Sequence, residues 1–459
     1  DNDSFFIGNK QSPWWIVAFG MIGTSLSGVT FISVPGWVGT AQFSYMQMVL
    51  GYLVGYAVIA TVLMPLYYRL NLTSIYSYLD DRFGRSSYRT GASFFLLSRT
   101  IGAAFRLYLV AGVLQLTIFD AWNVPFIVTV VATILFIWLY TYEGGIKTII
   151  WTDTLQTLFM LLAVILTVVI ISNQLGFGFT EMTSTIRNSD YSKIFFFEDV
   201  NHPKYFWKQF AAGASISLVM TGLDQDMMQK NLSCKNIGEA QKNMFSFSIV
   251  LVVVNLFFLA LGALLYLFAA AKGIEIPAKA DDLYPIIATG GHLPIIVGIL
   301  FILGLIAAAY SSADSALAAL TTSACVDILE IEKKPKSEQM SLRKMVHVVM
   351  SGLLIVTIMI FHWIGNDSVI AQVFTFAGYT YGPLLGLYGF GMLTNLSVRD
   401  KLVPIICLAS PLLTYVINIY SEALLFGYKF GFELLILNGA ITFAGLLLIS
   451  NGSKHRQTT

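Results

Sequence analysis

Long apolar stretches alternate with short polar segments along almost the whole chain. A helix needs roughly 20 apolar residues to cross the hydrocarbon core of a bilayer. The runs are continuous and longer than barrel strands, so the pattern predicts an all-α integral membrane protein. We expect about twelve transmembrane helices, at about 14–38, 46–68, 87–118, 125–142, 146–173, 205–229, 243–271, 292–328, 341–363, 369–394, 401–420 and 430–450.

Composition and charge agree with this class. The chain is 56% hydrophobic and only 12% charged, whereas soluble proteins average about 25% charged residues. The net charge of +1 offers no basic surface for nucleic acid. The expected partners are therefore the lipid bilayer and small solutes, and a monomer is plausible. The three cysteines are scattered and form no disulfide or metal framework.

The basic residues set an orientation. If the chain starts in the cytoplasm and alternates, most of its 27 Lys and Arg residues fall in cytoplasmic segments. Positive charge is enriched on that side of membrane proteins. We therefore expect a multi-pass protein of the plasma or inner membrane with both termini in the cytoplasm.

Glycine, serine and proline interrupt the first and sixth apolar stretches, at 20–36 and 213–222. Such interruptions are tolerated in lipid only where the freed backbone groups are buried or line a cavity. Interrupted helices in matching positions of two halves point to a transporter site. Residues 1–459 are expected to form one domain. Because the two stretches are five helices apart, the domain would contain inverted five-helix repeats at 14–173 and 205–394. Two additional helices and a tail at 395–459 would follow.

Ionisable groups inside the predicted helices are costly, so they are usually paired, hydrated or functional. Asp153, Asp314, Arg99 and Arg106 are the clearest cases. The eighth stretch surrounds Asp314 with serines, and hard cations such as Na⁺ prefer this kind of oxygen ligand. Alternatively, the serines bond to carbonyls of the preceding turn. A rise of 1.5 Å per residue puts the first interruption and these serines at similar depth.

Arg99 and Arg106 are seven residues apart and share one helix face. Two arginines on one face can bind a carboxylate through paired hydrogen bonds. The alternatives are pairing with an acid of the protein or contact with the membrane surface.

Four motifs carry a resemblance that runs along nearly the whole chain. They are D-x-F-x-x-G…P-W-W at 3–15, the interrupted GTSLSGVTF at 23–31, I-x-W-T-D-T-L-Q-T at 149–157 and A-x-x-S-S at 308–312. In this order they resemble the sodium:solute symporter family, which includes sodium/glucose, sodium/proline and sodium/sialic acid symporters. The resemblance implies an inverted-repeat transporter fold and one further helix before residue 1.

The resemblance also implies sites for one or two Na⁺ ions as co-substrate. The first would use Gly23, Leu26, Ala308, Ser311 and Ser312. The second, found in some members, would use Asp153, Asp314 and Ser315. The family usually has a hydroxyl residue at the position of Asp314. A second carboxylate there either strengthens a cation site or binds a proton, because two acids in a dry site repel each other.

Substrate positions follow from the same resemblance. Those that hold the sugar in galactose-type members match Thr30, Tyr45 or Gln47, Ser217 and Thr375. Met220 stands where the sugar gate is often aromatic, so a galactose-like mode is not expected to transfer. Ser25, Ser27 and Thr30 are more similar to the sialic acid type, and Arg99 and Arg106 would meet a carboxylate.

The sequence therefore predicts a sodium-coupled secondary active symporter. It would import a small polar organic solute, either a sugar or a sialic-acid-like or otherwise carboxylated solute, by alternating access. A proton-coupled symporter is the alternative, because of Asp314. An ion channel is less favoured, since no pore ring or filter sequence is visible. An enzyme is not expected, because the five histidines form no spaced pair and no nucleophile–base arrangement is evident.

Overall fold

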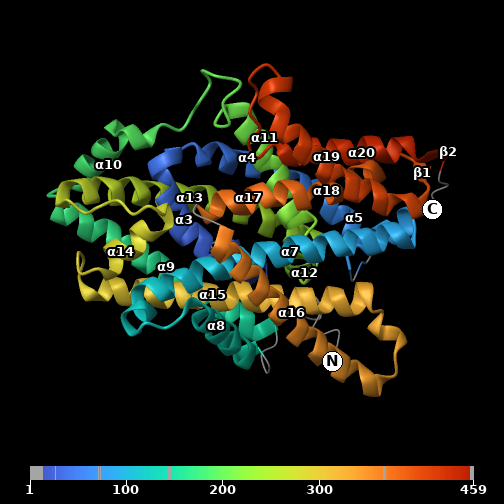
Figure 1. Ribbon diagram of the computed structural model, residues 1–459, viewed down its shortest axis with the longest axis horizontal. Coiled ribbons are helices and arrows are strands. Elements are labelled where there is room, and N and C mark those ends of the chain that lie inside the picture. The colour runs from blue at the N-terminus through green and yellow to red at the C-terminus, as the bar shows by residue number, and fades with distance from the viewer. Residues whose placement is uncertain are drawn as a thin grey trace.

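The computed structural model describes residues 14–25, 27–70, 72, 74–141, 146–364 and 368–454. Helices run mostly along the longest axis of the molecule (Figure 1). Those of the first half are α2 (Trp14–Ser25), α3 (Gly28–Ala41), α4 (Tyr45–Val58), α5 (Met64–Arg69), α6 (Ser77–Arg82), α7 (Arg85–Leu114), α8 (Phe126–Thr141), α9 (Ile146–Gln174) and α10 (Phe179–Asn188). Those of the second half are α11 (Phe206–Ser217), α12 (Gln225–Leu232), α13 (Ile237–Lys272), α14 (Leu283–Thr289), α15 (Ile295–Ser323), α16 (Lys336–Ile364), α17 (Val369–Thr380), α18 (Gly382–Leu393), α19 (Val403–Leu424) and α20 (Leu434–Leu448).

Each stretch that the sequence predicted to cross the membrane contains at least one helix. Within the described residues, seven helices are long and apolar enough to span a bilayer: Tyr45–Arg69, Arg85–Trp122, Thr157–Gln174, Ile237–Lys272, Ile295–Ile328, Glu338–Ile364 and Asp400–Leu424. Four shorter apolar helices occupy three further stretches, at Phe126–Trp138, Val369–Thr380, Gly382–Leu393 and Leu434–Leu448. The count of twelve crossings and the inverted repeats stay predictions.

The first interruption lies where the sequence placed it. Helix α2 ends at Ser25 and α3 begins at Gly28, after Ser27 adopts an extended conformation. Gly28 packs closely on two other helices. A methyl group added to it would lie 3.2 Å from Val110 of α7 and 3.9 Å from Ala308 of α15. The break therefore faces the helix that carries the serine cluster.

The sixth stretch divides into α11, a π-helical turn at Leu218–Gly222, and α12. The side chain of Asp224 caps α12, since its Oδ1 accepts the backbone N–H groups of Asp226 and Met227 at 3.0 and 3.2 Å. Helix α11 also packs closely on α4. A Cβ on Gly213 would lie 2.0 Å from the carbonyl oxygen of Met48. This close approach fixes α4 and α11 relative to each other.

The stretch at 369–394 differs from the single helix that we expected. It divides into α17 and α18 at Tyr381, just before Pro383, which has no backbone N–H to continue a helix. Asn438 of α20 satisfies the freed carbonyls, because its Nδ2 donates to Gly378 at 3.0 Å and to Tyr379 at 2.8 Å. The interruption is thus stabilised by a residue far along the chain.

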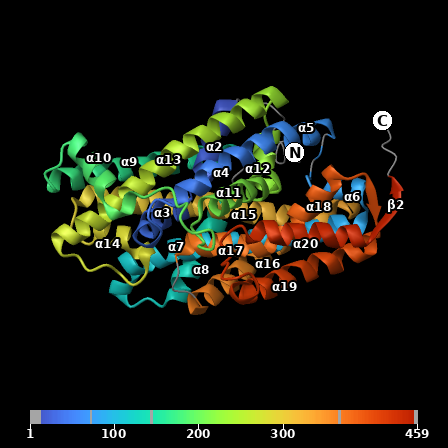
Figure 2. The ribbon, with the colours of Figure 1, turned by 90° about the horizontal axis from the view of Figure 1, so that it is seen from above.

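A small antiparallel pair departs from the all-helical expectation. Strand β1 (Leu396–Val398) pairs with β2 (Ser450–Lys454), with Ser397 opposite Asn451. The pair lies near the C-terminus at one end of the bundle, and α10 and α14 lie at the other end (Figure 1). Helices α19 and α20 lie side by side at one edge (Figure 2).

A buried carboxylate joins three elements at the α14 end of the bundle. Asp281 follows α13 and is only 6% exposed. Its Oδ2 accepts the N–H of Val369, the first residue of α17, at 2.9 Å. The preceding carbonyl, of Ala280, lies directly against Gly36 of α3. Burial raises the pKa of Asp281 to about 6.

We expect Asp281 to make stability depend on pH. Its native pKa exceeds the ordinary value of about 3.9, so the native state binds this proton more tightly than the unfolded state does. The stabilisation is full below about pH 4 and is lost as the pH rises through about 6, by on the order of 2–3 kcal/mol. Asp281→Asn keeps an acceptor for Val369 and cannot titrate. The melting temperature of the wild type should therefore fall relative to that of the variant between pH 4 and 7, and parallel curves would contradict this assignment.

Candidate functional site

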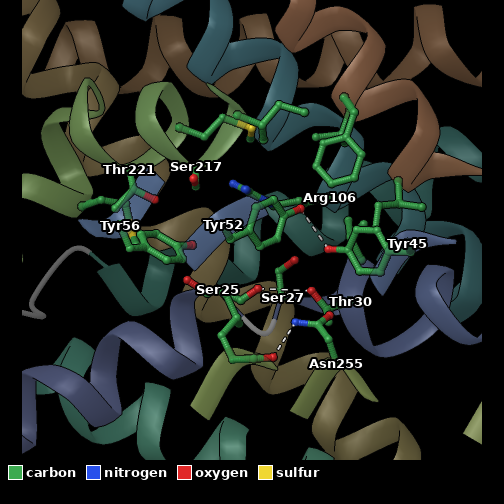
Figure 3. Close-up of a pocket in the computed structure, with 18 of the residues that line it drawn as sticks. Ser25, Ser27, Thr30, Tyr45, Tyr52, Tyr56, Arg106, Ser217, Thr221 and Asn255 are labelled. Carbon is green, nitrogen blue, oxygen red and sulfur yellow. Dashed lines mark hydrogen bonds between the residues drawn. The ribbon is translucent and has the colours of Figure 1, made fainter. Parts of the chain in front are cut away.

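A cavity of about 120 Å³ lies between the interruptions of the first and sixth stretches (Figure 3). Helices α4, α7, α13 and α17 complete its wall. It is lined by Ser25, Ser27, Val29, Thr30, Tyr45, Tyr52, Tyr56, Arg99, Arg106, Ile216, Ser217, Met220, Thr221, Met227, Leu251, Asn255, Ile370, Val373 and Phe374. The lining combines hydroxyl groups with aromatic rings, a combination suited to a polar organic molecule.

Several of the polar side chains have their hydrogen bonds within the wall. Thr30 donates its hydroxyl to the carbonyl of Ser25 at 3.1 Å. The hydroxyls of Tyr45 and Tyr52 lie 3.2 Å apart. Asn255 of α13 is different. Its Nδ2 donates to the carbonyl of Leu251 at 2.8 Å, while its Oδ1 is buried and has no partner among the described residues.

The two arginines of α7 have different surroundings. Arg99 lies 2.8 Å from Asp226 and 3.4 Å from Asp224, and all three side chains are largely buried. Tyr381 donates a further hydrogen bond to Asp224 at 3.3 Å. This cluster links α7 to the interruptions of the sixth and tenth stretches. Of the roles considered for the two arginines, Arg99 therefore has that of pairing with acids of the protein.

Arg106, seven residues after Arg99 on the same face of α7, lines the cavity together with Arg99. Within the described part of the chain, no hydrogen bond or ion pair of its guanidinium is recorded. Its side chain points towards the same space as those of Ser27, Tyr56 and Ser217 (Figure 3). Of the two arginines, Arg106 is therefore the one whose positive charge is available to an anion in the cavity.

The expected sodium ligands of α15 are buried near the first interruption. Ala308, Ser311 and Ser312 are each at most 6% exposed. The Oγ of Ser312 has no hydrogen-bond partner among the described residues. A buried hydroxyl without a partner is costly unless something else binds it. An oxygen-seeking cation such as Na⁺ would satisfy it, so these residues fit the ion.

The structure separates other expected residues. Gln47 is buried outside the cavity, where it donates to the carbonyl of Lys204 at 3.0 Å and accepts the N–H of Phe196 at 3.1 Å. Thr375 is exposed on α17 and donates to the carbonyl of Ala371, whereas its neighbours Val373 and Phe374 line the cavity. The structure therefore does not bring Gln47 or Thr375 to this cavity.

The structure describes the remaining expected sodium ligands only in part. Leu26 lies outside the described residues. Asp153 and Asp314 belong to α9 and α15, and their side chains lie outside the described part of the structure. Gly23 is in the last turn of α2. Ser315 is buried on α15, three residues after Ser312.

The sequence did not single out several cavity residues, among them Tyr52, Tyr56 and Asn255. Asn255 carried a usable signal, because it is a lone amide in a long apolar stretch. The tyrosines carried none, since aromatic residues are common throughout this chain.

Comparisons with known proteins find a matching family and similar proteins. The profile of the sodium:solute symporter family matches residues 5–392. The sodium/sialic acid symporter NanT of Aliivibrio fischeri is 29% identical over 418 residues, which cover 85% of this chain and 77% of that protein. The sodium/sialic acid symporter SiaT of Proteus mirabilis is 26% identical over 415 residues, which cover 85% of this chain and 79% of that protein.

A solved structure has a similar fold. It is a Na⁺-coupled sialic acid symporter in a substrate-bound, outward-open state. The TM-score is 0.80 at 19% identity, and the match covers 98% of this chain and 94% of the other.

The different roles of the two arginines predict different effects of one substitution. Arg99→Leu leaves Asp224 and Asp226 without their main counter-charge, so we expect a loss of about 3–5 kcal/mol in the free energy of unfolding. Arg106→Leu is the matched control on the same helix and removes no ion pair of the described residues. Thermal unfolding in detergent should show a large fall in melting temperature for the first variant and a small change for the second. Equal falls would contradict the assignment.

Proposed function

Because the chain belongs to the sodium:solute symporter family, we propose that it imports a small hydroxylated carboxylate, sialic-acid-like in chemistry, together with Na⁺ by alternating access. The single observation that carries the carboxylate is Arg106, whose charge faces the cavity while Arg99 is engaged by two acids. An unpaired guanidinium in a low-dielectric site favours an anion strongly, and its planar fork matches a carboxylate.

The rest of the solute would meet hydroxyls and one amide oxygen. Oδ1 of Asn255 is buried without a partner in the described part of the chain, so a solute that donates a hydrogen bond there is favoured over one that cannot. Ser25, Ser27 and Ser217 offer further donors and acceptors. A monocarboxylate without hydroxyl or amide groups would offer no donor to Oδ1 of Asn255. The two similar proteins named for sialic acid support the same class.

Sodium would supply the driving force. The proposed ion binds between the first interruption and α15, at Gly23, Leu26, Ala308, Ser311 and Ser312. Each net inward charge gains about 2.3 kcal/mol per 100 mV, which corresponds to roughly 40-fold accumulation. A carboxylate carried with a single Na⁺ moves no net charge, so the Na⁺ concentration gradient alone would drive its accumulation. Coupling follows if Na⁺ completes the site that then favours solute binding and closure. An inward Na⁺ gradient would make this direction import.

Transport in proteoliposomes tests the proposal. A panel of radiolabelled sialic acids, other carboxylates and neutral sugars is offered with and without an inward Na⁺ gradient. We expect Na⁺-dependent uptake of a hydroxylated carboxylate. Arg106→Lys keeps the charge and loses the fork, so KM should rise at least about 10-fold. In the wild type, the methyl ester of the solute should compete poorly with the radiolabelled solute for uptake. In Arg106→Gln, the ester should compete no worse than the free acid does. Uptake driven by a proton gradient alone would favour the proton-coupled alternative instead.

Ser312→Ala separates the sodium role from a structural one. The Ser312 hydroxyl has no partner to lose among the residues that the structure describes, so we expect the melting temperature to stay the same or rise slightly. The Na⁺ concentration for half-maximal uptake should rise several-fold. Ser323→Ala on the same helix is the control, because its hydroxyl donates to Asp327 at 2.6 Å. That variant should lose stability and keep its Na⁺ dependence. Unchanged Na⁺ dependence in Ser312→Ala would exclude this residue as a ligand.

A further inference from the structure

A lysine of α12 reaches across to the serine cluster of α15. The Nζ of Lys230 lies 3.5 Å from the Oγ of Ser315 and 4.0 Å from the Oδ2 of Asp226, one helical turn earlier on α12. The Lys230 side chain is 20% exposed, and Ser315 is buried. An ammonium group has three donors and no acceptor, so a hydroxyl and a carboxylate are suitable neighbours for it.

Two expected sodium ligands of one helix therefore have contrasting environments. Ser312 presents an oxygen with no partner among the described residues. Ser315, three residues later on the same side of α15, already has a cation within reach. Two positive charges in a low-dielectric region repel each other. A Na⁺ ion on Ser315 would have to displace the ammonium group or tolerate it as a close neighbour.

Lys230 shares one acid cluster with Arg99. Arg99 contacts Asp224 and Asp226, and the ammonium of Lys230 lies near Asp226. Arg99 makes the shorter contact with Asp226, at 2.8 Å, which leaves the ammonium of Lys230 directed also to α15. The ammonium of Lys230 thus lies within reach of both Ser315 and the acid cluster.

Building on the proposed function, we propose that Lys230 is a tethered cation that takes the place of a second Na⁺ at Ser315. The chain then couples one Na⁺, bound near Ser312, to each solute, although the ligand types expected for a second ion are present in the sequence. Lys230 is in this sense a residue that determines ion stoichiometry. Its ammonium remains attached to α12 throughout the cycle and is not transported.

Direct measurement of Na⁺ binding tests this inference without relying on transport. Isothermal titration of purified protein with NaCl, at constant ionic strength, should give one Na⁺ per chain for the wild type. Lys230→Met has similar length and no charge, so it should bind two. Lys230→Arg, which keeps the charge, should bind one. The same change at an exposed site, Lys242→Met on α13, is the matched control and should bind one.

The Hill coefficient for Na⁺ in solute uptake should follow the same order, near 1 for the wild type and rising towards 2 in Lys230→Met. Two Na⁺ bound by the wild type would overturn the inference, as would a single Na⁺ in a folded Lys230→Met. If that variant does not fold, Lys230→Gln replaces it, and the wild-type count still decides. A wild type that binds no Na⁺ would overturn the proposed sodium coupling itself, which is a different outcome.

Discussion

A polar group surrounded by hydrocarbon has no water to bind, and this constraint explains the arrangement of the interrupted helices. Each interruption exposes backbone groups that the protein must satisfy from within. Asp224 caps α12 after the sixth stretch, and Asn438 takes up carbonyls where α17 ends. Arg99 then neutralises Asp224, which would otherwise be a buried charge. These partners let the breaks exist without water.

Against this background the remaining unsatisfied atoms are informative. The Oγ of Ser312 and the Oδ1 of Asn255 are buried and without partners among the described residues. The first lies one helical turn along α15 from Ala308, which packs against Gly28 at the break of the opening helix, and the second lines the cavity. Native proteins rarely tolerate such atoms without a reason. Ser312 is a proposed ligand of the ion and Asn255 a proposed contact of the solute, so the proposed transport would give both atoms a partner.

Much of the fold was predictable, because the length and apolar content of a segment indicate a transmembrane helix. The interruption at 23–30 was predictable from its glycines and serines. The break at Tyr381 was not, since its stability depends on Asn438, 57 residues away in an apolar segment. Likewise, spacing showed that Arg99 and Arg106 share a face but not which of them meets Asp226. Thr375 illustrates the limit of matching positions, because one residue along a helix turns a side chain by about 100°.

The contact of Asn438 with the end of α17 has a mechanical consequence. One part of the cavity wall contains Ile370, Val373 and Phe374, all on α17. A swing of this segment about Tyr381 either breaks the two bonds to Asn438 or drags α20 with it. Helices α19 and α20 contribute no side chain to the cavity lining. Through Asn438, however, α20 would resist tilting of the α17 wall.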